Sequence, residues 1–315
     1  MRILAVIVVY KRNALETSSF ITLQRAREAV PPGRLDLRIH FHDNSCDGRD
    51  PGPIPDAVEY HAAGENSGLS RAYNHAARFA VSNGYDWLLT LDQDSSVPLN
   101  FLVRITEIAG AIENDLSIAA IVPLITEGGK MHSPYWFFGG VLPRYYPAGE
   151  NRVSTHDTYA FNSASTLRVS TLREVGGYNP WFWLDYSDGY IFRQFHRHGK
   201  RVYIAGDVQV SHDFASTHLE TQVSLDRYRN MQLAESAFWD LEMGTLAGME
   251  RTYRLARHSL SQFLSQGSPQ HRRITYEFLK RRLFWTRKRR LRAWEEETLG
   301  RFPALSQAGR MPPFI

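Results

Sequence analysis

The sequence predicts an α/β fold with a parallel sheet, and three observations support this class. In the first third of the chain, apolar segments of strand length alternate with helical segments. The first apolar run, residues 3–10, lacks polar alternation, as is typical of a parallel strand buried on both faces. Turn-forming residues follow the second and third apolar segments, at 43–48 and 64–68. In such a sheet, right-handed crossovers bring the loops after successive strands to one edge.

The expected elements of this first region can be placed in order. Strands are expected at residues 3–10, 35–42, 57–60 and 87–91, with helices at 15–29 and 69–82. Pro31-Pro32 ends the first helix, and Asn83-Gly84 ends the second. The fourth strand runs into Asp92, and Pro98 prevents its continuation.

The middle of the chain is rich in expected strands and in aromatic residues. Residues 118–125 and 163–168 are expected to be strands, followed by a short helix at 171–175 that ends at Gly176-Gly177. A helix at 189–198 and a strand at 208–211 complete this region. The aromatic residues between 135 and 146 are expected in core and hairpin packing, although a sugar platform is an alternative.

Composition limits the compartment and the kinds of site. The 315 residues include one cysteine, Cys46, which excludes an internal disulfide or a cysteine-based zinc site and fits a reducing compartment. The apolar run at 3–10 is too short to span a bilayer and lacks a small-residue cleavage site, so a strand is expected there and not a signal peptide. We therefore expect a cytoplasmic protein.

The net charge of +4 hides an uneven distribution. Residues 280–292 contain eight basic and no acidic residues, which leaves 29 basic against 33 acidic residues elsewhere. Apolar residues fall within one broad stripe at helical spacing in and beside this segment: Tyr276, Leu279, Leu283, Phe284, Leu291 and Trp294. Together they predict an interfacial helix on anionic lipid. A nucleic-acid contact and a purely solvated helix are the alternatives.

Several common enzyme motifs are absent from the sequence. It has no phosphate-binding loop and no G-x-G-x-x-G pattern, which argues against an NTPase or a dinucleotide-dependent dehydrogenase. It also lacks the G-x-S-x-G pattern of many hydrolases.

Asp92 and Asp94 form a D-x-D motif at the expected end of a buried strand. Ligands bind open α/β sheets at this edge. Two carboxylates that face one small volume repel each other unless a cation or hydrogen-bond donors neutralise them. Oxygen ligands suit Mg²⁺ or Mn²⁺, which usually complete their coordination with substrate phosphates. The alternative is a solvated acidic loop.

The motifs resemble, in their order, those of family 2 inverting glycosyltransferases with the GT-A fold, and most closely the rhamnosyltransferase branch. The resemblance covers about three quarters of the chain and departs at Lys11-Arg12 and at Gly189-Tyr190. It rests on Val8-Val9-Tyr10, Asp43-Asn44-Ser45, Asn66-x-Gly68-Leu69-Ser70-x-Ala72-x-Asn74, Leu91-Asp92-Gln93-Asp94-Ser95, Ser163-Ala164-Ser165, Val175-Gly176-Gly177-Tyr178, Leu184-Asp185-Tyr186-Ser187-Asp188, His212 and Arg227-Tyr228-Arg229-Asn230.

The resemblance implies a set of residues that bind the nucleotide-sugar donor. Asp43 would accept a hydrogen bond from a pyrimidine N–H, or would simply cap a turn. The region around Asn66 and Gly68 would let the backbone approach the nucleotide, with a helix N-terminus facing the diphosphate, or would be an ordinary helix start. The complete expected set is Val9, Tyr10, Asp43, Asn66, Gly68, Asn74, Asp92 and Gln93.

The resemblance also implies metal, catalytic and acceptor residues. Asp94 would bind Mg²⁺ or Mn²⁺ directly, with Asp92 and His212 completing the site. Asp188 would be the general base, because a carboxylate among aromatic residues gains proton affinity; its alternative role is a helix N-cap. Asp185 would orient acceptor hydroxyls. Acceptor contacts are expected from Trp181, Trp183 and Ser165.

These implications define an expected activity and domain organisation. The enzyme (EC 2.4) would transfer L-rhamnose from dTDP-rhamnose to a hydroxyl of a lipid-linked or cell-surface saccharide, at the inner face of the cell membrane. The resemblance implies a Rossmann-like GT-A domain with a mixed central sheet at 1–225, with a donor half at about 1–125 and an acceptor half at about 126–225. A helical basic extension is expected at 226–315. Alternatives are a UDP-glucose or UDP-galactofuranose donor, a nucleotidyltransferase, and a basic nucleic-acid-binding protein, although no nucleic acid is expected as a partner.

Overall fold

The computed structural model describes residues 1–315 except 49, 213–222, 266–267 and 308–314. The chain divides into two compact units, which are described separately. The first unit contains residues 1–136, 143–213 and 312–315, and the second contains 137–142 and 214–311. The short segment 137–142 therefore groups with the C-terminal helices, whereas a single boundary at 225 was expected.

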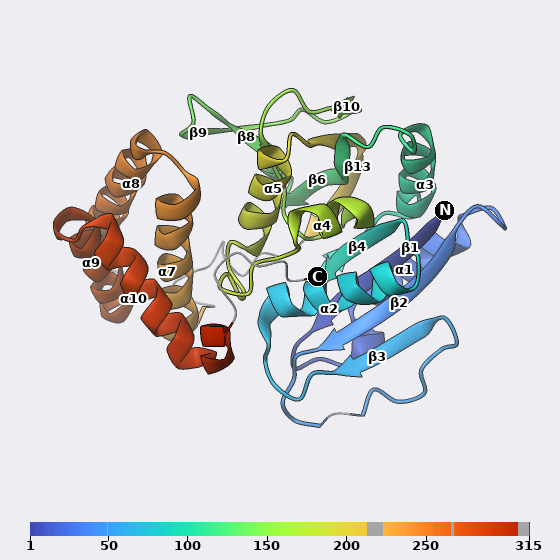
Figure 1. Ribbon diagram of the computed structural model, residues 1–315, viewed down its shortest axis with the longest axis horizontal. Helices are drawn as coiled ribbons and strands as arrows, with labels where there is room; N and C mark the ends of the chain where they lie inside the picture. Colours follow the sequence, from blue (N-terminus) through green and yellow to red (C-terminus); the bar gives the residue numbers. More distant parts are fainter. Residues whose placement is uncertain (49, 213–222, 266–267, 308–314) are drawn as a thin grey trace. The chain divides into compact units, whose positions relative to one another are not determined.

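Four parallel strands form the first part of the sheet, in the order β3-β2-β1-β4. Strand β1 is buried along nearly its whole length, which explains its unbroken apolar sequence. The prediction of a parallel arrangement for these four strands is confirmed (Figure 1). Their bounds are β1 (Arg2–Val9), β2 (Asp36–Asp43), β3 (Val58–Ala62) and β4 (Trp87–Asp92).

The remaining strands make the sheet mixed. β12 (Ser165–Arg168) pairs antiparallel with both β4 and β6 (Ile118–Glu127), and β6 pairs parallel with β13 (Arg201–His212). The sheet also contains β5 (Ser95–Ser96), β7 (Lys130–Ser133) and β10 (Arg152–Val153). A separate small sheet has the order β11-β8-β9, from β8 (Tyr135–Phe138), β9 (Leu142–Tyr145) and β11 (Thr158–Tyr159). The aromatic segment 135–146 thus forms hairpin strands, as expected.

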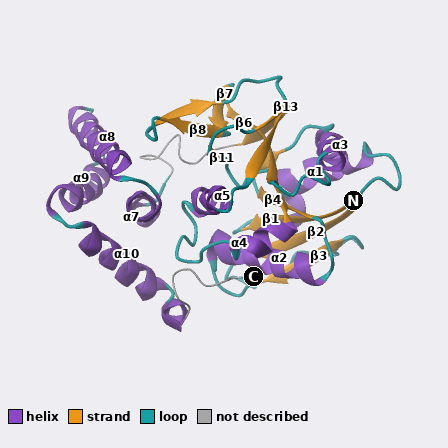
Figure 2. Cartoon of the chain, turned by 45° about the horizontal axis from the view of Figure 1, so that its top comes forward, coloured by secondary structure: helices purple, strands orange, loops and turns teal. Residues whose placement is uncertain are grey.

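Helices cover both faces of the large sheet. The step from β1 to β2 and the step from β3 to β4 run in opposite directions across the sheet, so right-handed crossovers place α1 (Ser18–Glu28) and α2 (Gly68–Ser82) on opposite faces (Figure 2). A short 3₁₀ helix, η1 (Ala14–Glu16), precedes α1. Helix α3 (Phe101–Ala111), which was not expected, packs beside α1. Helix α4 (Val169–Val175) packs beside α2 and ends at Gly176, whose φ of 84° suits a glycine. Helix α5 (Ser187–Arg197) begins two residues before the expected start.

The second unit contains four helices in its described part. They are α7 (Leu225–Glu242), α8 (Thr245–Leu264), α9 (Pro269–Phe284) and α10 (Arg287–Arg301), followed by the 3₁₀ helix η3 (Pro303–Gln307). Tyr228 of α7 is buried, and its hydroxyl lies 2.7 Å from Thr275 Oγ1 of α9. None of the helices in the described ranges has the length and apolar character needed to cross a bilayer.

Buried ion pairs account for part of the basic segment. Asp240 is 6 % exposed and pairs with Arg282 and Arg290, each at 2.7 Å. Arg281 pairs with Glu277 at 2.6 Å and with Glu297 at 3.0 Å. Because a buried carboxylate left without its partner is strongly destabilising, Arg282 and Arg290 stabilise the helical unit from within, whereas the partners of Arg281 are 38 % and 31 % exposed.

The expected single interfacial helix is therefore wrong in two respects. The segment forms two helices, α9 and α10, separated at Trp285 and Thr286. Trp294 is buried at 2 % exposure and belongs to the core of the unit, whereas Tyr276, Leu283 and Phe284 are exposed. Helical spacing could not reveal this break, because the stripe continues across it.

Candidate active site

The ends of three parallel strands bring the predicted acidic residues to one edge of the sheet. Val9 at the end of β1 pairs in register with Asp43 at the end of β2. Val8 pairs with Asp92 at the end of β4. Asp43 and Asp92 therefore flank the end of β1, as expected for side chains at the carboxyl edge of a parallel sheet.

The D-x-D turn meets His212 through a short antiparallel pair. Directly after Asp94, β5 pairs with the end of β13, and His212 stands opposite Ser95. The Nδ1 atom of His212 lies 3.1 Å from Ser95 Oγ and 3.6 Å from Asp94 Oδ1. One ligand atom each from Asp92, Asp94 and His212 lie within 4.8 Å of one another. The three predicted metal ligands are thus together in the structure.

The chemistry of this cluster fits a divalent cation. Asp94 Oδ1 is buried and has no hydrogen-bond partner. Burial, followed by the charge of Asp92, raises the pKa of Asp94 above its usual value. A cation would supply the missing partner and offset the repulsion. Two carboxylates and one imidazole suit Mn²⁺, and carboxylate oxygens with added water suit Mg²⁺.

Two side chains that were not predicted hold Asp92 in place. Tyr73 of α2 donates its hydroxyl hydrogen to Asp92 Oδ1 at 3.1 Å, and Ser163 donates to Oδ2 at 2.6 Å. Both carboxylate oxygens are therefore oriented from outside the D-x-D turn. Ser163 lies within the Ser-Ala-Ser motif and Tyr73 within the Asn-x-Gly motif, but sequence gave no reason to pair either with Asp92.

Asp188 lies in the first turn of α5 and is partly buried. Burial raises the pKa of Asp188 to about 7, and the negative charges of Asp92 and Asp185 contribute in the same direction. The backbone N–H of Gly189 donates to Asp188 Oδ1 at 2.7 Å, which opposes the rise. The alternative N-cap assignment is wrong, because Tyr186, with φ 62°, occupies the N-cap position. A carboxyl group with a pKa near neutrality is suited to accept a proton.

A layer of buried hydroxyl and amide groups lies beside Asp92. The rings of Tyr73 and Tyr178 are 5.1 Å apart. Burial raises the pKa of each phenol most, and the negative charges of Asp92 and Asp188 raise it further. The Tyr178 hydroxyl donates to Asn162 Oδ1 at 2.8 Å, while Asn162 Nδ2 donates to Ser187 Oγ at 3.1 Å. These contacts connect the carboxylate of β4 to the start of α5 within the first unit.

Asp43 has the turn-capping contact that was considered for it. Its Oδ1 accepts from the Ser45 backbone N–H at 2.7 Å, and its Oδ2 accepts from the Tyr60 hydroxyl. A carboxylate has about four acceptor positions, so these two bonds leave capacity for a further donor. Asn44 was not predicted as a site residue; its Oδ1 accepts from Ser67 Oγ at 2.8 Å and so joins the loops after β2 and β3. The base contact of Asp43 stays a prediction.

The Asn-x-Gly motif has structural contacts of its own. Asn74 Nδ2 donates to the Tyr178 carbonyl at 2.7 Å, and Asn74 Oδ1 accepts from the Tyr178 N–H at 2.8 Å. Gly68 has φ +80°, and an added Cβ would lie 2.3 Å from the Trp183 carbonyl oxygen. The close backbone approach at Gly68 is therefore to Trp183, whereas a nucleotide was expected. Asn66 Oδ1 accepts from the Gly68 N–H at 3.3 Å, as in an ordinary helix start.

The three expected acceptor residues are buried. Trp181 and Trp183 are 5 % and 7 % exposed, and Ser165 is fully buried on β12, where its hydroxyl donates to the Phe161 carbonyl at 2.6 Å. This placement contradicts a direct acceptor contact by Ser165, because its side chain is fully buried and its hydroxyl is bonded within the protein. Trp183 instead accepts a hydrogen bond from the Ser70 N–H at its carbonyl, at 3.2 Å.

Backbone strain occurs in the segments that carry the site. Lys11, Ala164 and Tyr186 are the non-glycine residues with positive φ in the described ranges, at 56°, 61° and 62°. They follow β1, precede β12 and precede Asp188, respectively. Such strain persists where surrounding structure enforces it, commonly at binding sites.

Gln93 Oε1 accepts from the Tyr10 N–H at 2.9 Å and so joins the D-x-D turn to the end of β1, which carries the expected donor residues Val9 and Tyr10.

Comparisons with known proteins agree with this architecture. Residues 50–176, which include the D-x-D turn, match the model of glycosyl transferase family 2. No curated protein matches the sequence. The solved structure of GalNAc-T7 with UDP, GalNAc and Mn²⁺ matches with a TM-score of 0.52 and 14 % identity, over 79 % of this chain and 54 % of that chain. S. aureus TarS matches with a TM-score of 0.47 and 12 % identity, over 92 % of this chain and 45 % of that chain. TarS 1–349 has the same TM-score and 11 % identity, over 98 % and 92 %.

The match to GalNAc-T7 supports the assignment of the fold. This chain spans about half the length of the GalNAc-T7 chain that it matches. The mixed central sheet, its covering helices and the similarity to that structure confirm the expected GT-A fold.

Proposed function

We propose that this chain is an inverting glycosyltransferase that uses a nucleotide-sugar donor and a divalent cation. The observation that carries the proposal is the Asp92–Asp94–His212 cluster at the carboxyl edge of the sheet. The match of residues 50–176 to glycosyl transferase family 2 gives the cluster its context. The GalNAc-T7 structure of similar fold contains UDP and Mn²⁺, which are the classes of ligand proposed here.

The metal and the donor phosphates would meet at the D-x-D turn. Asp94 and His212 would hold the cation, and Asp92 would complete the site while Tyr73 and Ser163 orient its carboxylate. A cation bound there would supply positive charge against the nucleotide diphosphate leaving group. Arg12 adds an exposed positive charge near the end of β1; its charge slightly opposes the rise in the pKa of Asp94, which burial and Asp92 cause. We assign Arg12 to the donor phosphates.

Asp188 performs the remaining chemical task. Its carboxylate takes the proton from the acceptor hydroxyl as that oxygen attacks the anomeric carbon. A single displacement breaks the bond to the diphosphate as the new glycosidic bond forms, so the anomeric configuration inverts. The pKa of about 7 lets Asp188 exist as the carboxylate near neutral pH and still bind a proton effectively. Asp185, whose negative charge also raises the pKa of Asp188, orients the acceptor.

The proposed donor is dTDP-rhamnose and the proposed acceptor is a lipid-linked or cell-surface saccharide. Both rest on the resemblance of the motif order to the rhamnosyltransferase branch. Asp43 remains the proposed contact to the pyrimidine N–H, through its unused acceptor capacity. A UDP-hexose would make the same contact, since uracil and thymine share this N–H, so the donor must be decided by assay.

The second unit is proposed to rest on an anionic membrane surface. Leu283 and Phe284 at the end of α9 are 58 % and 78 % exposed. The neighbouring Arg287, Lys288 and Arg289 are also exposed at the start of α10, and Arg289 lies over the Trp285 ring at 4.2 Å. Apolar side chains beside cations are the combination that anionic interfaces bind.

The decisive experiment is a donor panel with purified protein. The protein is incubated with dTDP-rhamnose, UDP-glucose and UDP-galactofuranose, with Mn²⁺ and a saccharide acceptor, and the released nucleoside diphosphate is measured. We expect release from dTDP-rhamnose and an inverted product anomer by NMR. Pyrophosphate release from a nucleoside triphosphate and a sugar phosphate would instead identify a nucleotidyltransferase. Tight, salt-sensitive nucleic-acid binding without donor turnover would reject the proposal.

A further inference from the structure

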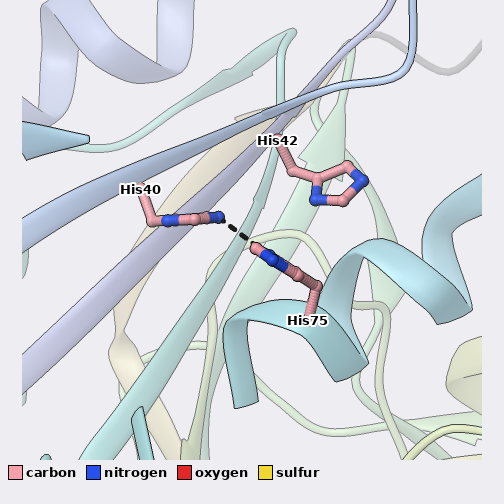
Figure 3. A group of neighbouring side chains, drawn as sticks. All are labelled: His40, His42 and His75. Atoms are coloured by element: carbon pink, nitrogen blue, oxygen red, sulfur yellow. Dashed lines mark hydrogen bonds between the residues drawn. The ribbon is translucent and has the colours of Figure 1, made fainter. Parts of the chain in front are cut away.

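A cluster of histidines lies in the first unit, apart from the metal ligands described above. His40 and His42 are two residues apart on β2 and therefore point to the same face of the sheet. His75 comes from α2, which covers that face. The ring nitrogens of His40 and His75 point toward each other, and the His42 ring lies beside them (Figure 3). One ring nitrogen from each of the three residues lies within 4.8 Å of the others.

The protein itself leaves part of this cluster without hydrogen bonds. His40 and His42 are each 3 % exposed, and the Nδ1 atoms of both are buried and have no hydrogen-bond partner. Buried polar atoms are nearly always paired with protein, water or a ligand. His40 Nδ1 faces Glu59 Oε2 at 3.6 Å, so it is the Nδ1 atom of His42 that indicates a missing partner inside the cluster.

The geometry suits a small, nitrogen-preferring metal ion. His40 Nε2 and His75 Nδ1 are 3.3 Å apart. In a tetrahedral zinc site with Zn–N bonds of about 2.0–2.1 Å, neighbouring nitrogens lie about 3.3–3.4 Å apart. His42 Nε2 lies 3.4 Å from Ser67 Oγ, which leaves its unpartnered Nδ1 for the ion.

The surroundings also match what a metal-bound imidazole requires. With Nε2 of His40 on the metal, Nδ1 would face Glu59 Oε2, now 3.6 Å away. Carboxylates commonly receive the second ring N–H of metal-binding histidines and fix the ring orientation. Burial lowers the pKa of His40 to about 4, of His42 to about 3 and of His75 to about 4. All three imidazoles are thus neutral at physiological pH, which is the form that binds metals.

We infer that His40, His42 and His75 form a second metal site, selective for Zn²⁺ or a similar transition-metal ion. Its three nitrogen ligands distinguish it from the oxygen-rich D-x-D site, because imidazole suits zinc whereas carboxylates suit Mg²⁺ and Mn²⁺. The fourth position belongs to water or to His61 of β3, whose ring centroid is 4.1 Å from that of His75 and 4.9 Å from that of His42.

The position of the site gives it a structural role beside the donor loops. It joins β2, which ends at the loop 43–45, to α2, which begins at the loop 66–68. His42 contacts Ser67, whose hydroxyl donates to Asn44 Oδ1 at 2.8 Å. Bound zinc would therefore stabilise the loops at 43–45 and 66–68 without touching the reacting groups.

The experiment disables the D-x-D site, so that Zn²⁺ binding reports on the histidine site. Zn²⁺ affinity is measured by competition with a chromophoric chelator in Asp94→Ala, in which the D-x-D site has lost its central ligand. We expect one Zn²⁺ per chain, with three or four imidazole ligands by X-ray absorption at the zinc edge. Adding His75→Gln should weaken this binding by at least about 100-fold, since even changes around the ligands cost about 10–100-fold.

The matched control is His156→Gln in the same Asp94→Ala protein. His156 is an exposed histidine that stacks on Trp136, so its loss should leave Zn²⁺ affinity unchanged. Failure of Asp94→Ala to bind Zn²⁺, fewer than three imidazole ligands, or equal affinity in the His75→Gln and His156→Gln proteins would overturn the inference. Circular dichroism checks folding, and the absorption spectrum decides the ligand count if His75→Gln does not fold.

Discussion

His212 Nδ1 lies 3.6 Å from Asp94 Oδ1, and the antiparallel pairing of His212 with Ser95 holds the two side chains at this separation. The pairing joins the last residue of β13 to the strand that directly follows the D-x-D motif. The proposed metal site therefore depends on the edge of the sheet as much as on the acidic residues themselves. Changes that loosen the β5–β13 pair would separate the ligands without altering any of them.

Asp94→Ala should abolish divalent-ion dependence and nearly all turnover, because the departing diphosphate would lose its neutralising cation. The measurement is nucleotide release with and without a chelator, over a range of Mn²⁺ concentrations. Asp56→Ala, an exposed carboxylate in the loop before β3, is the control and should behave as wild type. Wild-type activity of Asp94→Ala in chelator would show that Asp94 does not hold a metal.

Asp188→Asn should lower kcat by about 10²–10⁴ with little change in donor affinity, because the amide cannot accept the proton. In the wild type, Asp188 is protonated below its pKa of about 7, so kcat should rise with pH and level off above 7. In Asp188→Asn this rise of kcat with pH should disappear. Donor affinity is measured by calorimetry and turnover is measured as a function of pH. Loss of a general base changes the pH profile with little effect on donor affinity, whereas loss of a structural residue should also weaken donor binding. Near-normal turnover would move the role to Asp185.

The same substitution should change stability in a predictable direction. The folded-state pKa of Asp188 lies above its unfolded value, so the folded protein binds more protons between about pH 4 and 7. The stability contributed by this group is present at low pH and is lost as pH rises through 7. Asp188→Asn should therefore be more stable than wild type at pH 8 and lose that advantage near pH 4, in urea unfolding of the donor-free protein.

Ser163→Ala should weaken the metal site without removing a ligand. Ser163 orients one oxygen of Asp92, and losing such a partner typically costs about 10–100-fold in metal affinity or activity. The expected result is a higher Mn²⁺ concentration for half-maximal turnover. The control is Ser96→Ala: Ser96 is a partly buried residue of β5, and its hydroxyl makes no hydrogen bond to Asp92, Asp94 or His212. Equal Mn²⁺ curves for both variants would contradict the orienting role.

Asn74→Ala should destabilise the first unit by about 2–6 kcal/mol. The substitution leaves the buried N–H and carbonyl of Tyr178 without partners, at about 1–3 kcal/mol each. Urea unfolding measures the loss, and Asn83→Ala, at the exposed end of α2, should cost far less. Unchanged stability together with weaker donor binding would instead support the donor contact predicted from sequence.

Replacing Arg287, Lys288 and Arg289 by glutamine should weaken binding to anionic vesicles by about 100-fold, at about 1 kcal/mol for each cation near the surface. These residues are chosen because Arg282 and Arg290 neutralise buried Asp240, so that truncating the tail would disturb folding. Co-sedimentation with vesicles measures binding, with the exposed set Arg25, Arg27 and Arg34 changed to glutamine as control. Equal losses in both proteins would show nonspecific charge attraction only.

Local sequence determined most of the long strands and helices, and it predicted the acidic residues of the candidate metal site. Unbroken apolar runs predicted β1 and β4 because parallel strands are buried on both faces. The D-x-D motif predicted Asp92 and Asp94 as metal ligands, because few residue types can bind a divalent cation, and the family resemblance added His212 to the expected site. These inferences depend on neighbouring residues and on side-chain chemistry, which a sequence contains directly.

Contacts between distant residues were decided only by the tertiary structure. Ser163, just before β12, and Tyr73 of α2 reach Asp92, Asn74 bonds to Tyr178, and Ser165 is fully buried. The same holds for the arginines that pair inside the helical unit and for the three histidines of β2 and α2. Burial and pairing depend on which surfaces meet after folding, and a hydroxyl or imidazole has the same sequence pattern whether it faces solvent, a carboxylate or a metal.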